Sequence, residues 1–408
     1  MGLINNIWRK ISKSNALDQA GGKLEILFFE DVYRVAYVAG LSTMDRDIPY
    51  LIYSSIVKLV MTTLVCTEIW YMFTQTQTYG ANQFGSTDQN NKHNLLQSDH
   101  KEMYQKLARC MDSSYFDTTT KKRSQLVKYW AKTHQKYVKL LLGLGNCTLA
   151  AWHLYPLVDE LDYNLMVSVR LPFGYETFLR YSFTYLIVGI AFMYVSHFVM
   201  VTDLMMQAHL VPLVCQFSVL ADCFENIEQD CSVGMEGLYC DLTTNNDFIR
   251  EYLSRLGNLV EQHKLILNYS MDLKAILSGP MLGQLAASGT LICFVGYQAT
   301  TSIVENITKC LMSIFYLGYN MFGLYIICRW CEELTLQSRS IGNAIYSSGW
   351  EAGMSTLPGV RSTIVLVIAR ASKPLVLTAG GMYNLSLNSF TTLVKTSYSA
   401  LTVLLRFR

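Results

Sequence analysis

The chain has 408 residues, of which 51% are hydrophobic and only 16% are charged, and its mean hydropathy is +0.22. Soluble domains average about 25% charged residues, so the shortfall indicates several lipid-facing segments. The net charge of +2 argues against a nucleic-acid partner. The sequence has no P-loop, dinucleotide-binding, zinc-protease or nucleophile-elbow motif and no metal-ligand spacing, so we expect no enzymatic activity, no cofactor and no metal site.

Residues 1–49 are predicted to stay in the cytoplasm and to contain one amphipathic helix. They include no apolar signal segment. An apolar stripe at helical spacing would be formed by Leu27, Phe28, Val32, Val35 and Ala36. Such a stripe is typical of a helix that lies on a membrane surface or on the protein itself and does not cross the bilayer.

Hydropathy indicates six clear membrane spans. A helix needs about 20 apolar residues to cross a hydrocarbon core of about 30 Å. The predicted spans are 50–73, 138–157, 180–203, 273–300, 309–329 and 384–405.

Residues 74–136 do not fit a topology in which successive loops lie on alternate sides of the membrane. Ten Lys and Arg residues at 75–136 and six before Pro49 place both segments in the cytoplasm, although one clear span separates them. Three explanations stay open: a polar span within 75–96, a re-entrant segment at 50–73, or a missing piece of sequence.

Two segments are predicted to extend beyond the bilayer. An unbroken helix from residue 180 would have about 47 residues and a length of about 70 Å, so we expect a break at Pro212 and an exit from the membrane. After a polar loop at 225–246, an amphipathic helix leads into the span at 273–300. We expect a polar turn at 329–350 and then a short helix at 361–374.

The last segment, 382–408, contains a span with a single charged residue, Lys395, between positions 384 and 405. One face of this helix would consist of small hydroxyl residues and one valine. They are Ser389, Thr392, Thr396, Ser399 and Val403. Hydroxyl groups inside a membrane face either other helices or water. Periodicity therefore leaves helix packing and pore lining as alternatives.

The C-terminal segment TAGGMYNLSLNSFTTLVKTSYSALTVLLRFR resembles the signature of insect odorant receptors. The matching positions are Thr378, Ala379, Gly380, Leu385, Leu387, Phe390, Ser397, Tyr398, Ser399 and Leu405. LVKYWAKTHQKYVKLLLGLG and LPFGYETF also resemble this family, so the likeness covers most of the chain. It implies an all-α membrane protein with the seven-transmembrane-helix insect odorant receptor fold, an N-terminus inside, and a second helix that this sequence supports poorly.

The resemblance implies the odour-tuning subunit, not the shared co-receptor, of a heteromeric odorant-gated non-selective cation channel. Its partners would be the odorant receptor co-receptor in a heterotetramer, a small hydrophobic volatile ligand and membrane lipid. It would be a multi-pass protein of the plasma membrane of the olfactory sensory neuron dendrite. A gustatory receptor-type channel, a seven-helix G-protein-coupled receptor and a transporter are the alternatives.

The same resemblance divides the chain into functional segments. Residues 1–49 would be the cytoplasmic segment, and 50–203 would hold the first four transmembrane helices with the ligand pocket. Helices five and six would occupy 273–329, and the pore-lining helix 382–408. A cytosolic anchor domain would combine 204–272 with 330–381.

A volatile ligand needs an apolar cavity with aromatic walls and a few polar groups. Gly145, Thr148 and Trp152 share one helical face, and so do Tyr316 and Tyr319. Both sets resemble pocket residues of the family. Weaker additions on the intervening span are Phe183, Phe192 and Met193. Ordinary packing between helices is the alternative for each of these residues.

Alignment of the final residues with the family places Val403 and Phe407 at a hydrophobic gate, on the helix that carries Ser399. A hydrophobic ring closes a pore by excluding water. Arg406 would lie near the extracellular mouth, where four copies would repel cations and one copy would be tolerated. This charge argues for a heteromer and against a homotetramer.

Overall fold

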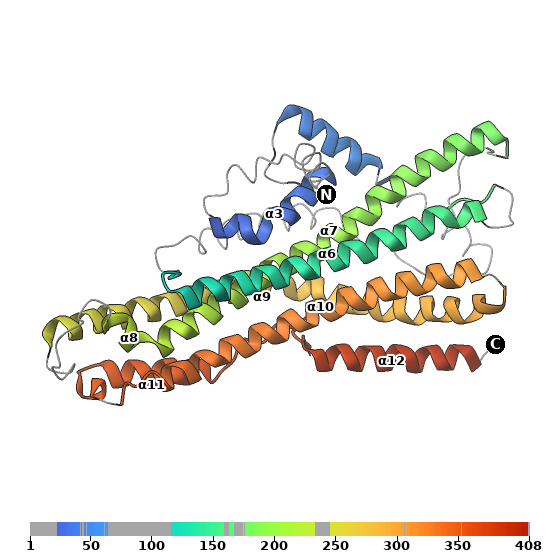
Figure 1. The fold of residues 1–408 in the computed structure, drawn as a ribbon. Helices are drawn as coiled ribbons and strands as arrows, with labels where there is room; N and C mark the ends of the chain where they lie inside the picture. The colour runs from blue at the N-terminus through green and yellow to red at the C-terminus, as the bar shows by residue number, and fades with distance from the viewer. Residues whose placement is uncertain are drawn as a thin grey trace.

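The computed structural model of the chain is a bundle of long helices with a small two-stranded hairpin (Figure 1). It describes residues 23–40, 42, 45, 47–60, 62–63, 116–158, 163–166, 174, 176–232, 245–305, 307–351 and 353–406. The helices are α3 (Lys23–Val38), α6 (Lys121–Val158), α7 (Phe178–Glu225), α8 (Ile227–Ser232), α9 (Asn246–Glu305), α10 (Ile307–Tyr346), the short 3₁₀ turn η2 (Met354–Thr356), α11 (Val360–Ala371) and α12 (Leu387–Arg406). A further short helix covers Ile48–Val60. The polar span considered within 75–96 lies outside the described residues.

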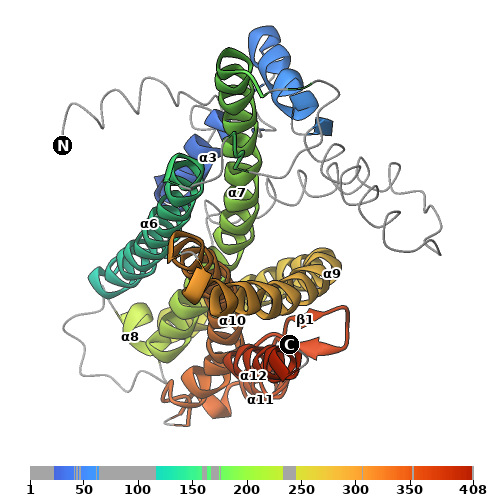
Figure 2. The same cartoon turned by 90° about the vertical axis from the view of Figure 1, so that its right-hand side faces the viewer.

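Helix α10 lies at the centre of the bundle. It packs against α6, α7, α9, α11 and α12, and Figure 2 shows it among these neighbours. Its buried stripe continues past the predicted span through Trp330, Leu334, Ser338, Ile341 and Ile345. The expectation of a polar turn at 329–350 is therefore wrong for most of that segment. Apolar residues at helical spacing, separated by polar ones, keep α10 helical to Tyr346.

Pro212 does not end α7, contrary to the expectation from the sequence. A proline inside a helix costs about 3 kcal/mol through one lost hydrogen bond and a steric clash. Here Leu210, Val211, Leu213 and Val214 beside it are all fully buried. The packing of these neighbours outweighs the local cost, so the helix continues.

The long helices are much longer than a bilayer is thick. At 1.5 Å per residue, the 48, 60 and 40 residues of α7, α9 and α10 give about 72, 90 and 60 Å, against a hydrocarbon core of about 30 Å. By length and composition, these three helices can each cross a membrane. About half or more of each must therefore lie outside the lipid core, as predicted for the two long segments.

Burial changes along α7 in the way that such an exit requires. Phe178, Phe183 and Ile187 in its first half are more than 60% exposed, although they are large and apolar. Leu204 and Phe217 in its second half are fully buried. The first half therefore presents apolar side chains suited to lipid, and the second half belongs to a densely packed core.

The N-terminal helix α3 lies on the protein. It packs against α6 and α7, and Phe28, Val32 and Ala36 of the predicted stripe are buried there. This contact decides between the two positions that the sequence left open.

The hairpin of β1 (Thr378–Ala379) and β2 (Tyr383–Asn384) connects the bundle to α12. Gly380 and Gly381 turn the chain with φ of +60° and +72°, a region that glycine adopts readily. A Cβ atom on Gly380 would lie 2.6 Å from Leu282 Cδ2, and the Gly380 amide donates to the carbonyl of Ser278 at 2.8 Å. Both glycines thus form the turn, and Gly380 holds it against α9.

A buried group of charges joins α6, α7, α8 and α9. The Arg123 side chain, 1% exposed, contacts Asp117 at 2.7 Å, Asp222 at 2.9 Å and Asp230 at 2.5 Å. Arg255 of α9 bonds to Asp117 and lies 3.3 Å from Asp230. Burial alone would raise the pKa of Asp117, but hydrogen bonds from Thr119 and the pairing with Arg255 hold it at about 2.

Removal of Arg123 is expected to destabilise this group strongly. Arg123→Ala leaves three carboxylates without their shared cation, and the loss of one partner from a buried ion pair typically costs about 3 to 5 kcal/mol. Thermal unfolding of the purified protein in detergent measures the effect. Lys264→Ala, which breaks an exposed pair with Glu261, is the matched control and should cost at most about 1 kcal/mol. Equal melting temperatures for the two variants would contradict the role of Arg123.

Two buried histidines predict a loss of stability in acid. Burial lowers the pKa of His134 to about 4, and burial together with Arg370 lowers the pKa of His263 to about 4. The unfolded chain takes up these protons below a pH of about 6.5, whereas the folded chain does so only near pH 4, so stability falls as the pH drops between these values.

We expect each histidine to remove about 1 to 2 kcal/mol between pH 7 and pH 5. His134→Gln and His263→Gln should each reduce the difference between the melting temperatures at pH 7 and pH 5. His197→Gln, at a partly exposed histidine whose ring bonds to the Met193 carbonyl one turn earlier in the same helix, is the control and should not. An unchanged pH dependence in both buried variants would show that these groups do not carry it.

Candidate functional site

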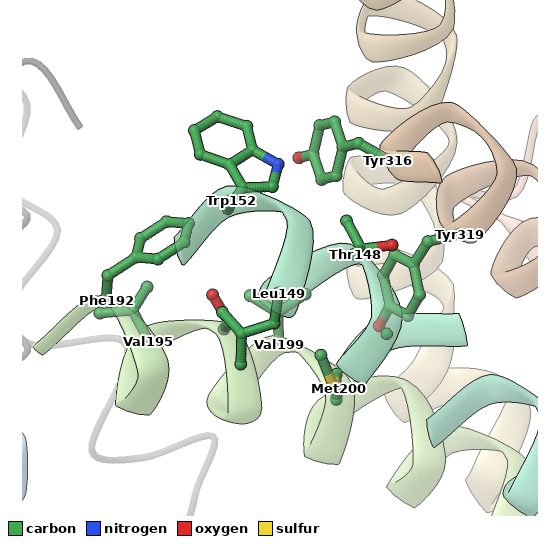
Figure 3. Close-up of a pocket in the computed structure, with 11 residues that line it drawn as sticks. Thr148, Leu149, Trp152, Phe192, Val195, Val199, Met200, Tyr316 and Tyr319 are labelled. Carbon is green, nitrogen blue, oxygen red and sulfur yellow. The ribbon is translucent and has the colours of Figure 1, made fainter. Parts of the chain in front are cut away.

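A cavity of about 240 Å³ lies where α6, α7 and α10 meet (Figure 3). Its walls are mostly apolar or aromatic. The lining residues are Gly145, Thr148, Leu149 and Trp152 of α6, Phe192, Val195, Ser196, Val199 and Met200 of α7, and Tyr316 and Tyr319 of α10. Spacings of three and four recur within each set, so each helix presents one continuous face to the cavity.

One end of the cavity, which we name the aromatic end, is formed around Trp152. Its ring centroid lies 5.4 Å from that of Phe192 and 6.2 Å from that of Tyr316, the second pair in an edge arrangement. Figure 3 shows the indole nitrogen of Trp152 and the hydroxyl of Tyr316 on facing sides of these two rings. This end offers flat apolar surface with polar groups at its edge.

The other end, which we name the inner end, is formed by Gly145, Met200 and Tyr319. A Cβ atom on Gly145 would lie 2.6 Å from Met200 Cε and 3.2 Å from Tyr319 Cε2. The first distance is too short for two non-bonded carbon atoms. Glycine at this position therefore lets the side chains of α7 and α10 approach α6, and any larger residue would fill the inner end.

The two hydroxyl groups at the inner end already donate hydrogen bonds to the protein. Tyr319 Oη donates to Asp203 Oδ2 at 3.1 Å. Thr148 Oγ1 donates to the carbonyl oxygen of Leu144 at 2.8 Å and lies 3.2 Å from that of Phe315. Each hydroxyl has one proton, and these bonds use it, so each oxygen has only lone pairs left for a further partner.

The structure brings six of the eight predicted ligand-binding residues to this cavity. They are Gly145, Thr148, Trp152, Phe192, Tyr316 and Tyr319. Phe183 and Met193 do not line it, and they are 61% and 40% exposed. Phe183 lies more than two turns before Phe192, and Met193 follows Phe192 at about 100° around the helix, so both point away. Ligand binding at the six residues stays a prediction.

Sequence reasoning missed five lining residues. These are Leu149, Val195, Ser196, Val199 and Met200. Four of them follow Phe192 on α7 at spacings of three, four, seven and eight, so extension of the Phe192 face along the helix would have found them. Asp203, one turn beyond Val199, continues the same series to the carboxylate that binds Tyr319.

Helix α12 contacts α9 through one face. Gly289 and Gly296 leave room for Leu393 and Leu401, since a Cβ atom on either glycine would lie 3.2 or 3.0 Å from the facing leucine. Ser397 Oγ donates to the carbonyl of Gly289 at 3.0 Å. The opposite face is exposed within this chain and includes Thr392, Lys395, Thr396, Ser399 and Val403.

The predicted pore residues Ser399, Val403 and Arg406 are all exposed in the single chain, whereas Phe407 lies outside the described residues. The hydroxyl of Ser399 donates to the carbonyl of Lys395 at 3.0 Å, so its proton is satisfied within the helix. A pore role for these residues stays a prediction.

No metal centre is formed by the residues that the structure describes. No group of three His, Cys, Asp or Glu side chains there could hold an ion. The CxxC pair Cys328 and Cys331 consists of free thiols, fully buried in α10. These two cysteines therefore act as small apolar core residues.

Comparison with protein families gives one match across most of the chain. The family model described as 7tm Odorant receptor matches residues 48–398. Odorant receptor 13a of Drosophila melanogaster is 30% identical over 160 residues, which are 37% of this chain and 38% of that protein. Odorant receptor Or2 of Anopheles gambiae is 30% identical over 38% of this chain and 39% of its own length. Putative odorant receptor 92a of Drosophila melanogaster is 24% identical over 68% of this chain and 65% of its own length.

Solved structures show the same architecture. The insect olfactory receptor OR5 from Machilis hrabei in complex with eugenol has a TM-score of 0.69 and 15% sequence identity, covering 94% of this chain and all of the other. A second structure of OR5 gives a TM-score of 0.70 over 93% of this chain and 98% of the other. This likeness confirms the fold class predicted from the sequence.

A methyl group at the inner end is expected to weaken binding of small aromatic molecules. Gly145→Ala must displace Met200 into the cavity, and overpacking of this kind costs about 1 kcal/mol or more, which is about a fivefold rise in Kd. The shift in melting temperature with increasing benzyl alcohol or benzaldehyde measures binding by the purified protein.

Gly143→Ala is the matched control for this variant. Gly143 lies on the same helix, and a Cβ atom there would meet nothing within 4 Å. If Gly145→Ala and Gly143→Ala bound the probes equally well, the cavity would not be their site.

Proposed function

This chain belongs to the insect odorant receptor family, and from that premise we propose that it is the odour-binding subunit of an odorant-gated, non-selective cation channel assembled with the odorant receptor co-receptor. It is a membrane receptor and not an enzyme. The observation that carries the channel proposal is the exposed polar face of α12, which the following paragraphs connect to the cavity.

The cavity suits a small, mostly apolar ligand. A dry cavity of about 150 Å³ is large enough for benzene. The cavity here, at about 240 Å³, has room for a substituted ring or a chain of similar bulk. The related fold of OR5 was solved with eugenol, also a small aromatic molecule. A hydrophobic volatile is therefore the ligand class that we propose.

The outer face of α12 supports a pore at a contact with other chains. Lys395 lies in the middle of this face, and Thr392, Thr396 and Ser399 surround it. A charged residue at the centre of a membrane helix normally faces other protein or a water-filled space, because transfer of the charge to lipid costs several kcal/mol. Since no part of this chain covers that face among the described residues, water enclosed by several copies of such a helix is the environment that fits it.

The charges on the same helix favour a mixed assembly. Lys395 is exposed near its middle and Arg406 in its last turn. Four copies of this chain around one axis would place eight such charges along a passage for cations, a strong electrostatic barrier. A single copy beside neutral partners lowers that barrier. This reasoning supports a heterotetramer with the co-receptor.

Helix α10 connects the cavity to the proposed pore, which suggests how ligand binding would open the channel. The cavity residues Tyr316 and Tyr319 belong to α10, which also packs against α12 and α9. A ligand that binds more tightly when α10 is in its open-state position shifts the closed–open equilibrium, and only this difference in affinity can open the pore. We place the assembled channel in the plasma membrane of the sensory dendrite, with the N-terminus inside.

Thiol labelling of α12 tests the pore proposal. In cells that express this chain with the co-receptor, odour-evoked current should fall by more than half when a charged, membrane-impermeant thiol reagent reaches Ser399→Cys or Val403→Cys. Leu393→Cys is the control on the same helix, because Leu393 packs against Gly289 and should be protected. The unsubstituted chain sets the background, since Cys147 is exposed.

Two results would overturn the proposal. A full cation current from this chain expressed alone would exclude the requirement for a partner. Equal insensitivity of all three cysteine variants, with surface expression and labelling verified, would mean that α12 does not line the pore.

A further inference from the structure

Asp203 is a buried carboxylate next to the cavity that the proposed function does not yet use. It lies near the middle of α7, one turn beyond the cavity residue Val199, and is 4% exposed. None of the ion pairs among the described residues includes it. Its neighbours are Tyr319 Oη at 3.1 Å and Gln284 Nε2 at 3.5 Å. Burial of such a group without a cation costs free energy that an apolar residue would not.

The effect of Asp203 on the cavity passes through Tyr319. Tyr319 lines the inner end, while its hydroxyl donates to the carboxylate behind it. The phenol has one proton, so the oxygen that remains available to a ligand can only accept a hydrogen bond. Without Asp203, the same hydroxyl would be free to rotate and donate.

The hydroxyl oxygen of Thr148 can likewise only accept a hydrogen bond from a ligand, for a reason that does not involve Asp203. Its hydroxyl proton is directed to the carbonyl of Leu144 at 2.8 Å, a bond within α6. In Figure 3 its side chain lies next to that of Tyr319. The two polar groups closest to the inner end therefore both present acceptor oxygens, so that a ligand carbonyl or ether oxygen would meet lone pairs there.

We propose that Asp203 makes the inner end a hydrogen-bond acceptor and thereby selects volatiles that carry a hydroxyl group, namely alcohols and phenols, over aldehydes, ketones and ethers of the same shape. This inference rests on the proposed function, since it names the ligand class of the same cavity. Asp203 acts as a positioning residue: it does not line the cavity, and it fixes the proton of a residue that does.

The size of the preference follows from one hydrogen bond. A neutral hydrogen bond contributes about 0.5 to 1.5 kcal/mol net, and an acceptor placed against an unpaired acceptor loses that amount and some desolvation free energy as well. A difference of 1.4 kcal/mol is tenfold in affinity. We therefore expect the wild-type channel to prefer the hydroxyl compound of a matched pair by about tenfold.

The test uses pairs of probes with one carbon skeleton. Benzyl alcohol is compared with benzaldehyde, and cyclohexanol with cyclohexanone, as concentration–response curves of current through the channel with its co-receptor. Both members of a pair are applied to the same cells, and the measured quantity is the ratio of their half-maximal concentrations. Changes in expression or in gating affect both members and cancel from this ratio.

Three variants separate the polarity of Asp203 from its volume. Asp203→Leu releases the Tyr319 proton and should bring the ratio from about ten to about one or invert it. Tyr319→Phe removes one of the two acceptor oxygens and should reduce the preference, with that of Thr148 left in place. Asp203→Asn keeps a carbonyl oxygen that can accept from Tyr319, so it should retain the preference for alcohols. If the preference depended on the negative charge of Asp203 alone, this variant would lose it.

The outcomes distinguish this inference from the proposed function. If no probe opened the channel, or if Gly145→Ala left both curves unchanged, the cavity would not be the odour site and the proposed function would fail. If the channel responds and Gly145→Ala shifts the curves, but the ratio is the same in the wild type and Asp203→Leu, only the role of Asp203 fails. A wild-type preference for the carbonyl compounds would also overturn it.

Discussion

The abrupt change of packing near Met200 determines where this bundle can hold a ligand. Beyond Met200, most residues of α7 are buried, and interiors packed at that density leave few voids larger than a water molecule. Before it, large apolar side chains such as Ile187 are exposed, and Figure 1 shows α7 diverging from α10 toward that end of the bundle. The cavity lies at this boundary, where helices that are held firmly on one side begin to separate on the other.

The same boundary brings the cavity close to the helices that support α12. Asp203 of α7 lies between Tyr319 of α10 and Gln284 of α9. Five residues after Gln284, Gly289 of α9 packs against Leu393 of α12. Two side-chain contacts and one turn of helix therefore connect the inner end of the cavity to the support of the terminal helix. Such contiguous, packed routes carry coupling free energies of about 1 to 3 kcal/mol in other proteins.

Sequence patterns predicted the parts of this structure that local physics controls. Faces at helical spacing grouped five of the cavity residues, since Gly145, Thr148 and Trp152 must share a side of any helix, as must Tyr316 and Tyr319. The length argument predicted that the helix from residue 180 is longer than a bilayer is thick, and α7 has 48 residues. Prediction failed where tertiary packing determines the length of a helix. Buried neighbours keep α7 helical through Pro212. After Trp330, the buried apolar residues of α10 are separated by polar ones, so the segment reads as a polar turn in the sequence. The Asp203–Tyr319 contact joins residues 116 positions apart, and no local pattern reveals such a pair.

The turn at Gly380 gives α12 a fixed end and a free end. Its start is tied to α9 by the Gly380 amide and to α10 by a 2.7 Å hydrogen bond from the Leu387 amide to Glu332, whereas its last residues have no comparable attachment among the described parts of the chain. A helix of 20 residues is about 30 Å long, so a tilt of about 5° about the turn displaces the far end by about 3 Å and the near end hardly at all. Helix α12 can therefore pivot about the pair of glycines, and Val403 lies near its far end, where a small rotation gives the largest displacement.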